Sequence, residues 1–152
     1  MDYSDWKVKL AAEVVQSFVG MNRIILKFTQ QNADSLGLTV AQMGVLNTIY
    51  AFPGITLKEI SLKTHSPKST ISISIDGLAT SGVVERKPSA EDRREVFLYV
   101  TSRGEKLARK SCENALSYKA MMLALEKIPQ EDIQTLLEIH QDLLINLQKV
   151  EL

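Results

Sequence analysis

The sequence has few of the residues on which several classes of protein depend. A single cysteine, Cys112, cannot form a disulfide within the chain. The two histidines, His65 and His140, have no cysteine or second histidine at ligand spacing, so we expect no metal site and no cofactor. No apolar stretch approaches the roughly 18 residues of a membrane span. These absences indicate a soluble, cytoplasmic protein that forms a single domain over residues 1–152.

An excess of charge of one sign is also lacking, because lysines plus arginines and aspartates plus glutamates both total 18. The charges are nevertheless unevenly distributed. Residues 58–110 hold eleven basic and seven acidic residues, a net charge of +4, whereas residues 111–152 hold three basic and seven acidic residues, a net charge of −4. A site for a polyanion is therefore expected in the middle of the chain.

The residue groups of common enzymes are missing as well. The sequence has no nucleophile beside a base, no glycine-rich loop that would hold a phosphate and no cluster of metal ligands. Catalysis is therefore the weakest of the functional hypotheses, and we expect that the protein is not an enzyme.

Apolar residues at helical spacing predict helices at both ends of the chain. In the first helix, which should end near Gly37, they are Trp6, Leu10, Val14, Phe18, Met21, Ile25 and Phe28. Thr101 can cap a long helix over about residues 102–127. The acidic residues behind Pro129 suit the start of another helix, which runs almost to the end of the chain.

Two capping boxes predict the starts of two helices in the middle of the chain. In each box, a threonine is followed three residues later by a side chain that can reach back to the threonine's own N–H. Thr39 and Gln42 begin a helix that "FPG" stops, and Thr56 and Glu59 begin a short helix that runs to about Lys63.

The next segment, "HSPKSTISISIDGLATSGVVER", has two competing interpretations. Isoleucines alternate with serines before the dipeptide "DG", as in a strand that enters a hairpin turn. A helix over about residues 67–80 explains the segment better. Ser66 can cap this helix, Pro67 suits its first position, and its apolar residues then share one face.

Two stretches after Gly82, "VVERK" and "EVFLYVT", suit strands. Pro88 and an unbroken run of charged residues from Glu91 to Glu95 separate them, which predicts a two-stranded hairpin with a charged tip. A short helix joined by a tight turn to a second helix and followed by such a hairpin is the layout of a winged helix-turn-helix.

The charged tip of the hairpin suggests a role in binding DNA. An arginine can enter a narrow minor groove, where its planar guanidinium bridges acceptors on bases and sugars. Asp92 can hold the guanidinium of Arg94 by a charge-assisted pair and direct it. The plainer alternative is a solvated hairpin tip, whose surface ion pair is worth about 0 to 1 kcal/mol.

The predicted helix before the hairpin carries further candidate DNA contacts. The residues that lie away from its apolar face are Lys68, Ser69, Ser72 and Ile73. The small hydroxyls allow close approach, and Lys68 can meet phosphate or guanine. Two interpretations of Ile73 stay open: it contacts a thymine methyl group, or it is an additional core residue.

The stretch "EDRREVFLYVTSRGEKL" resembles the wing and following helix of the MarR family of winged helix-turn-helix transcriptional regulators. The family pattern is Asp-x-Arg-Arg or Asp-Arg-Arg, alternating apolar residues and then Leu-Thr-x-x-Gly. Val100 stands where leucine is commoner, and the other places are filled by Asp92, Arg93, Arg94, Thr101 and Gly104. Residues 38–46, 57–61 and 69–86 are also similar to successive helices of the family.

The resemblance implies a mainly α fold with a small β-hairpin wing. Residues 38–101 would form the DNA-binding winged helix-turn-helix, and residues 1–35 and 103–152 would form dimerisation helices. It implies a homodimer that binds a palindromic operator in double-stranded DNA. The family often has arginine where Ile73 stands. The expected DNA-binding residues are Lys68, Ser69, Ser72, Ile73, Arg86, Asp92, Arg93 and Arg94, with Arg86 on the DNA backbone.

The remaining notable residues favour structural roles. Cys112 is expected to be buried in a helix rather than to act as a redox sensor. A group of aromatic and methionine residues could line a small-molecule pocket, as relatives often have, but core packing is the simpler interpretation. The group comprises Trp6, Phe18, Phe28, Met43, Tyr50 and Met121.

Two hypotheses of different classes follow. The leading one is a DNA-binding transcriptional regulator, a repressor that a small-molecule effector releases from its promoter. The alternative is a winged-helix adaptor that uses the same surface to bind a protein partner. Ionic strength separates them, because DNA binding falls steeply with salt and a largely apolar contact does not.

Overall fold

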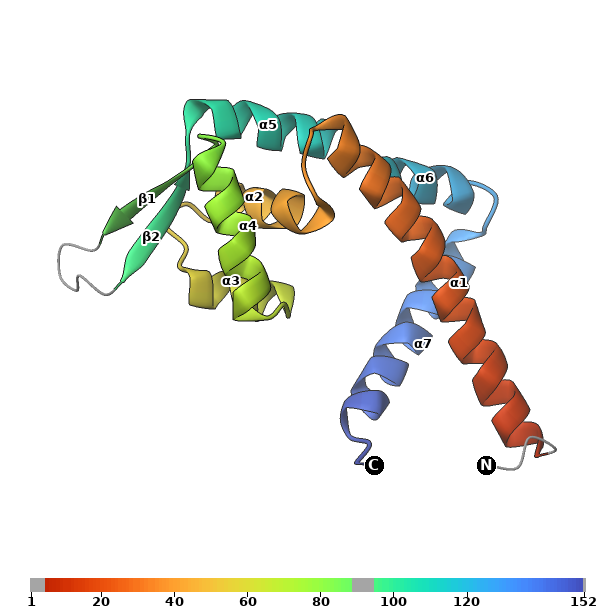
Figure 1. Cartoon of the computed structure of the whole chain (residues 1–152). Helices are drawn as coiled ribbons and strands as arrows, with labels where there is room; N and C mark the ends of the chain where they lie inside the picture. Colours follow the sequence, from red (N-terminus) through yellow and green to blue (C-terminus); the bar gives the residue numbers. More distant parts are fainter. Residues whose placement is uncertain (1–4, 89–94, 152) are drawn as a thin grey trace. The chain divides into compact units, whose positions relative to one another are not determined.

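The computed structural model describes residues 5–88 and 95–151. In chain order its elements are α1 (Trp6–Ser35), α2 (Val40–Ala51), α3 (Leu57–Thr64), α4 (Lys68–Thr80), β1 (Val84–Pro88), β2 (Val96–Val100), α5 (Ser102–Glu113), α6 (Leu116–Leu125) and α7 (Gln130–Gln148) (Figure 1). β1 and β2 pair as an antiparallel hairpin. The predicted mainly α fold with a β-hairpin wing is confirmed.

The chain divides into two compact units, which we describe separately. The first unit, Met1–Leu116, contains α1 to α5 and the hairpin. The second unit, Ser117–Leu152, contains nearly all of α6 and the whole of α7, and none of its described residues is buried. Within the described ranges, no helix is both long and apolar enough to cross a membrane.

An aliphatic core holds α2, α3, α4, the hairpin and α5 together. Its largest fully buried aliphatic side chains are Leu46, Ile49, Ile60, Ile75, Leu78, Val45 and Val83. Burying an aliphatic side chain of this size is worth about 1.5–3 kcal/mol. Ile71, Ile75 and Leu78 share the buried face of α4, as predicted, so this helix must present its opposite face to the outside.

Both predicted capping boxes are present. At α2, Thr39 Oγ1 accepts a hydrogen bond from the N–H of Gln42 at 3.1 Å, and Gln42 Oε1 accepts from the N–H of Thr39 at 3.0 Å. At α3, Glu59 Oε2 accepts from the N–H of Thr56 at 2.8 Å, and Thr56 Oγ1 accepts from the N–H of Glu59 at 3.3 Å. The first box is closed by a neutral amide and the second by a carboxylate.

The capping hydrogen bonds at the start of α3 should therefore weaken in acid, whereas those at the start of α2 should not. Hydrogen bonds from the backbone N–H and then the hydroxyl of Thr56 lower the pKa of Glu59. A carboxylate with a lowered folded-state pKa stabilises the fold above its ordinary pKa and loses that contribution as the pH falls through the lowered value. In an NMR titration below about pH 4.3, the ordinary glutamate pKa, the amide resonance of Thr56 should shift while that of Thr39 stays constant.

Glu59→Gln is the matched variant, because it converts the second box into a copy of the first. The Thr56 resonance should then no longer titrate, although α3 stays capped. A Thr56 resonance that still moves with pH in this variant would show that another group controls it.

The start of α4 differs by one residue from the prediction. Pro67 occupies the cap position, no side chain caps the helix, and Lys68 is the first helical residue. The Ser66 hydroxyl, which we expected to cap α4, donates to the carbonyl oxygen of Thr64 at 3.2 Å instead. Ser66 belongs to the preceding turn, because its N–H donates to the Ser61 carbonyl at 3.3 Å and its carbonyl accepts from Ser61 Oγ at 2.7 Å.

The prediction of one long helix over residues 102–127 is wrong, because the chain forms α5 and α6 with a break between them. A residue 79 positions away in sequence contacts the end of α5 at this break: buried Asn32 of α1 donates from Nδ2 to the carbonyl oxygen of Ser111 at 3.0 Å. In a continuous helix that oxygen would accept from the N–H of Ala115. Here the N–H of Ala115 bonds to the carbonyl of Cys112 at 3.3 Å.

Ser111 joins three helices of the first unit. Besides its carbonyl contact with Asn32, its Oγ accepts a hydrogen bond from Asn47 Nδ2 of α2 at 2.9 Å. Ser111 itself is 2% exposed. Within the described residues, the Oδ1 atoms of both asparagines are buried without a hydrogen-bond partner. We call Asn32, Asn47 and Ser111 the polar junction.

Several residues expected in the interior are exposed. Trp6 and Phe18 of α1 expose 66% and 38% of their surface, so core packing within the first unit does not explain them. Cys112 is exposed, which corrects the expectation that it is buried. It follows the buried Ser111 by about 100° of helix rotation, which turns its side chain outward. Met43, by contrast, is buried as expected.

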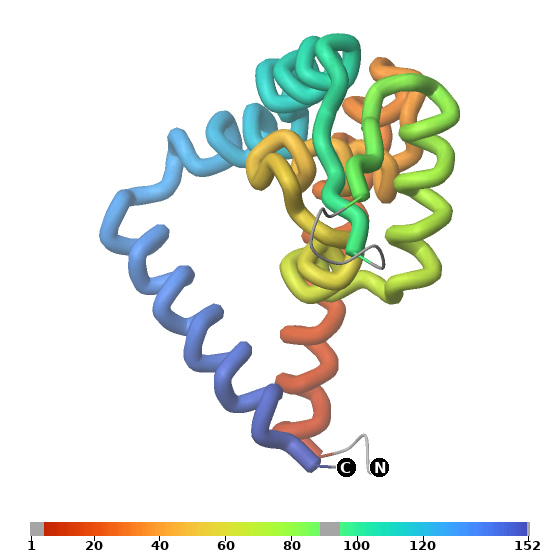
Figure 2. The backbone as a smooth tube through the Cα atoms, turned by 90° about the vertical axis from the view of Figure 1, so that its left-hand side faces the viewer, coloured from red at the N-terminus to blue at the C-terminus, as the bar shows by residue number. Residues whose placement is uncertain are grey.

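Thr101 joins the hairpin to α5, which follows β2 directly (Figure 2). Its hydroxyl accepts from the N–H of Gly104 at 3.1 Å, the predicted cap, and donates to the Gly82 carbonyl at 2.8 Å. Its N–H donates to the Val83 carbonyl at 3.0 Å. That same carbonyl oxygen lies so close to Gly104 that an added Cβ would overlap it. Close backbone approach therefore requires glycine at this position.

Candidate nucleic-acid interface

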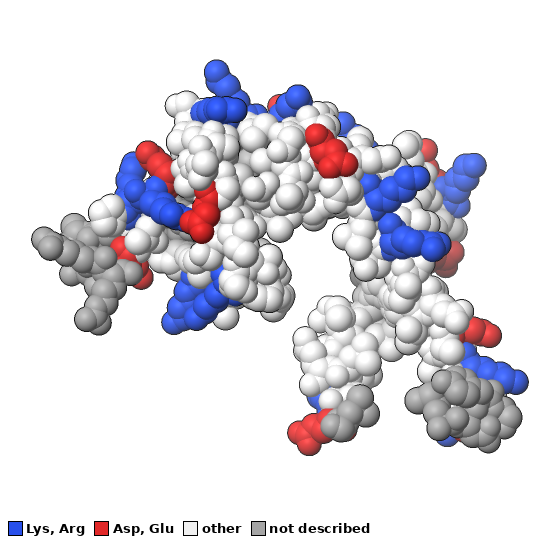
Figure 3. Space-filling model, viewed as in Figure 1, with Lys and Arg blue, Asp and Glu red and all other residues white. Residues whose placement is uncertain are grey.

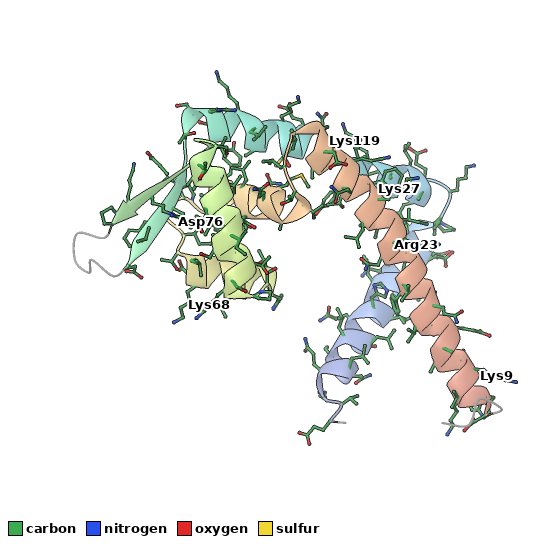
Figure 4. The ribbon with its side chains drawn as sticks, in the orientation of Figure 1. Lys9, Arg23, Lys27, Lys68, Asp76 and Lys119 are labelled. Carbon is green, nitrogen blue, oxygen red and sulfur yellow. The ribbon has the colours of Figure 1, made fainter. Side chains whose placement is uncertain are left out.

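The outward face of α4 carries small polar residues, one cation and one isoleucine. Its members are Lys68, Ser69, Ser72, Ile73 and Asp76. At about 100° per residue they span an arc of about 140°, on the side opposite the buried isoleucines. Figure 4 shows Lys68 at the first turn of α4 and Asp76 further along the helix toward the hairpin. All four residues expected on this helix thus lie on one accessible face, which is the arrangement that a helix needs to enter a groove.

Ile73 is 72% exposed. It therefore does not belong to the core, which removes one of the two interpretations that the sequence left open. The interpretation that Ile73 contacts a thymine methyl group stays a prediction.

A tight turn sets the angle between α3 and α4. His65 ends α3 in the left-handed region, with φ of 50°, a conformation uncommon for a residue other than glycine. The two hydrogen bonds between Ser61 and Ser66 close the turn. Nearby, Lys63 lies over the ring of Phe52 at 4.1 Å. The short helix, the fixed turn and α4 together make a helix-turn-helix.

The hairpin forms the base of a wing beside this helix-turn-helix. Its register pairs Val84 with Val100 and Pro88 with Val96. Lys87 bonds to Glu85 at 2.8 Å and lies 4.8 Å from the centre of the Tyr99 ring, and the hydrogen bond to Glu85 is the main cause of its raised pKa. The predicted tip residues Asp92, Arg93 and Arg94 lie outside the described residues.

An ion pair ties the wing to α4. The guanidinium of Arg86 on β1 donates to Asp76 Oδ1 on α4, and both side chains are partly exposed, by 43% and 59%. Arg86 is thus partly neutralised by a carboxylate that the sequence had suggested only as part of a turn. A shallow hollow between α4 and the wing is lined by Leu57, Ser72, Ile75, Asp76, Arg86, Val96 and Leu98.

The charges of this region are mixed rather than uniformly positive. Figure 3 shows acidic side chains next to basic ones over α4 and the hairpin. The net charge of +4 over residues 58–110 is therefore partly cancelled where the structure places the groups together. Among the described residues, no three acidic, histidine or cysteine side chains gather into a possible metal site.

The chain from the residue after α1 to the residue before β2 matches a known protein family. Residues 36–95 fit the model described as the MarR family. Over these residues, the chain belongs to the MarR family. The matched residues include α2, α3, α4 and β1, which carry most of the candidate DNA contacts.

The chain is similar, along almost its whole length, to a known regulator. An HTH-type transcriptional regulator of Staphylococcus aureus (strain MRSA252), itself uncharacterized, is 27% identical over 139 residues, which cover 89% of this chain and 95% of that protein. MarR-family proteins are transcriptional regulators that bind DNA, not enzymes, and this chain is such a regulator.

Solved structures give the same family fold. The multiple antibiotic-resistance repressor (MarR) of Listeria monocytogenes is 29% identical and has a TM-score of 0.63, covering 96% of this chain and 100% of its own. A Staphylococcus aureus MarR in complex with salicylate and kanamycin is 24% identical, with a TM-score of 0.77, and covers 93% of this chain and 95% of its own. The second of these supports the fold alone.

Proposed function

We propose that this MarR-family protein is a cytoplasmic repressor that binds a palindromic promoter site as a homodimer. The observation that carries the proposal is the outward face of α4, where Lys68, Ser69 and Ser72 stand opposite the buried core face. α4 would enter the major groove, and the wing tip with Asp92, Arg93 and Arg94 would reach the adjacent minor groove. Arg86 would contact the DNA backbone while bonded to Asp76.

The homodimer is supported by apolar surface on the terminal helices. In α1, Trp6, Leu10 and Met21 expose more than half of their surface. In α7 the same holds for Leu137, and Leu147 is 65% exposed. Such apolar stripes on helices need a covering partner, and a second copy of the chain is the proposed one. Two copies would place two α4 helices on successive major grooves, about 34 Å apart.

A small-molecule effector would control the repressor. The support comes from relatives, since one Staphylococcus aureus MarR structure contains salicylate and kanamycin. An effector that binds one conformation of the dimer better than the other would change the separation of the two α4 helices and release the promoter.

Arg94→Ala should weaken operator binding by about 1–3 kcal/mol without unfolding the protein, because it removes a guanidinium from the proposed minor-groove contact. A gel-shift titration with a fragment of the protein's own genome measures the loss. Arg109→Ala is the control, because Arg109 lies on α5 and pairs with Glu105 at 2.7 Å. If the Arg94 variant and the unaltered protein bound the operator with equal affinity, the wing would not be part of the proposed interface.

A further inference from the structure

The outward face of α4 lacks the side chains that most often read bases. Arginine contacts guanine and asparagine or glutamine contacts adenine through paired hydrogen bonds. The helix sequence, "KSTISISIDGLAT", has none of these three residue types and a single lysine. Its one carboxylate, Asp76, is already bonded to Arg86. Lys68 at the first turn, the serine hydroxyls and Ile73 are therefore the groups available to read bases directly.

The serine hydroxyls cannot provide much discrimination by themselves. A hydroxyl both donates and accepts hydrogen bonds, so Ser69 and Ser72 can bond to several base edges. Their small size has a different effect, because it lets the helix backbone approach the base pairs closely. Close approach would bring the adjacent Ile73 side chain to the floor of the groove.

Ile73 has the exposure and the surroundings that a base-reading apolar side chain requires. It is 72% exposed and follows Ser72 directly, with Ser69 one helical turn before it. Lys68 stands at the N-terminal end of the same face and can pair with a phosphate. An apolar side chain within a polar, cation-bearing face matches a nucleic acid better than a hydrophobic protein surface, because a hydrophobic partner would also have to cover Lys68 and Asp76.

We propose that Ile73 is a specificity-determining residue that reads thymine through its C5-methyl group. Thymine is the base that presents a methyl group in the major groove of unmodified DNA, next to its O4 acceptor. Each half of the operator would then contain at least one thymine whose methyl group lies against Ile73. This inference rests on the proposed function and adds to it the class of base that α4 selects.

Replacing thymine by deoxyuridine tests the proposal, because it removes the methyl group and leaves every hydrogen bond of the base in place. An operator duplex is first selected from a random-sequence pool with the unaltered protein, and deoxyuridine is then introduced at each thymine in turn. We expect one symmetry-related pair of thymines to respond, with a loss of affinity of about fourfold per half-site. Ile73→Ala should bind the thymine and uracil duplexes equally.

Two further variants separate base reading from general effects. Ile73→Val keeps a branched apolar side chain and should retain part of the thymine preference. Leu62→Ala removes an apolar side chain of similar exposure, 66%, from the neighbouring helix α3, and should leave the preference intact. Circular-dichroism melting of each variant checks that the fold is unchanged.

The outcomes distinguish this inference from the proposed function. If the protein binds DNA but no thymine responds to loss of its methyl group, or if Ile73→Ala keeps the full response, the inference is overturned and the proposed function stands. If no duplex is selected at any salt concentration, both fall.

Discussion

Gly104→Ala should lower the free energy of unfolding by about 3 kcal/mol, because its new methyl group would overlap the carbonyl oxygen of Val83. The overlap cannot be relieved by moving a flexible side chain. The Val83 carbonyl is backbone and accepts the N–H of Thr101 at 3.0 Å, and Thr101 in turn caps α5. The variant must therefore disturb the junction of the hairpin and α5. Urea unfolding followed by circular dichroism measures the change in midpoint.

Gly44→Ala is the matched control for this prediction. Gly44 is also helical, but an added Cβ would meet nothing within 4 Å in the described structure. Alanine is the better helix former, so this variant should gain up to about 1 kcal/mol. If both variants shifted the unfolding midpoint equally and in the same direction, the close approach of the Val83 carbonyl would not be the reason for glycine at position 104.

Salt should weaken DNA binding steeply. Each phosphate neutralised by the protein releases counterions, so the logarithm of affinity falls linearly with the logarithm of salt concentration. A dimer that makes about 6–10 phosphate contacts would lose about 10³–10⁵ in affinity between 50 and 200 mM salt. Fluorescence anisotropy with a labelled operator gives the slope. Affinity that scarcely changes over this range would favour the winged-helix adaptor that binds protein through an apolar contact.

Lys68→Gln should reduce that slope by about one unit per subunit if Lys68 contacts a phosphate. The effect is separate from any change in base preference, because phosphate contacts carry no sequence information directly. Lys27→Gln removes the same charge from α1, outside the helix-turn-helix, and is the control (Figure 4). A slope that changes equally in both variants would argue for a diffuse charge effect rather than a contact at the start of α4.

The parts of the fold that local chemistry determines could be predicted from the sequence. Both capping boxes depend on residues three positions apart, and both helices begin where the boxes place them. The hairpin strands were also predictable from their composition. The break between α5 and α6 was not, because it coincides with a tertiary hydrogen bond between Asn32 and the carbonyl of Ser111, 79 residues apart. The sequence around Ser111 gives no indication that Asn32 is its partner.

The same distinction applies to the candidate site. Helical spacing placed Lys68, Ser69, Ser72 and Ile73 on one face, because spacing and face are linked by the helix period. The pairing of Arg86 with Asp76 was missed, because it joins β1 to α4 through tertiary packing. Many sequences have an acidic residue ten positions before an arginine, and many folds place a helix next to a strand. Neither pattern alone therefore predicts the contact.

The polar junction has a mechanical consequence. Since Asn32 of α1 and Asn47 of α2 each donate a hydrogen bond to Ser111 of α5, these helices cannot slide past each other without breaking a buried hydrogen bond. Leaving a buried polar group unsatisfied costs about 1–3 kcal/mol. The junction therefore acts as a strut between the first helix and the frame of the helix-turn-helix. Any motion of α1 along α2 or α5 must therefore carry the frame of the helix-turn-helix with it or break these hydrogen bonds.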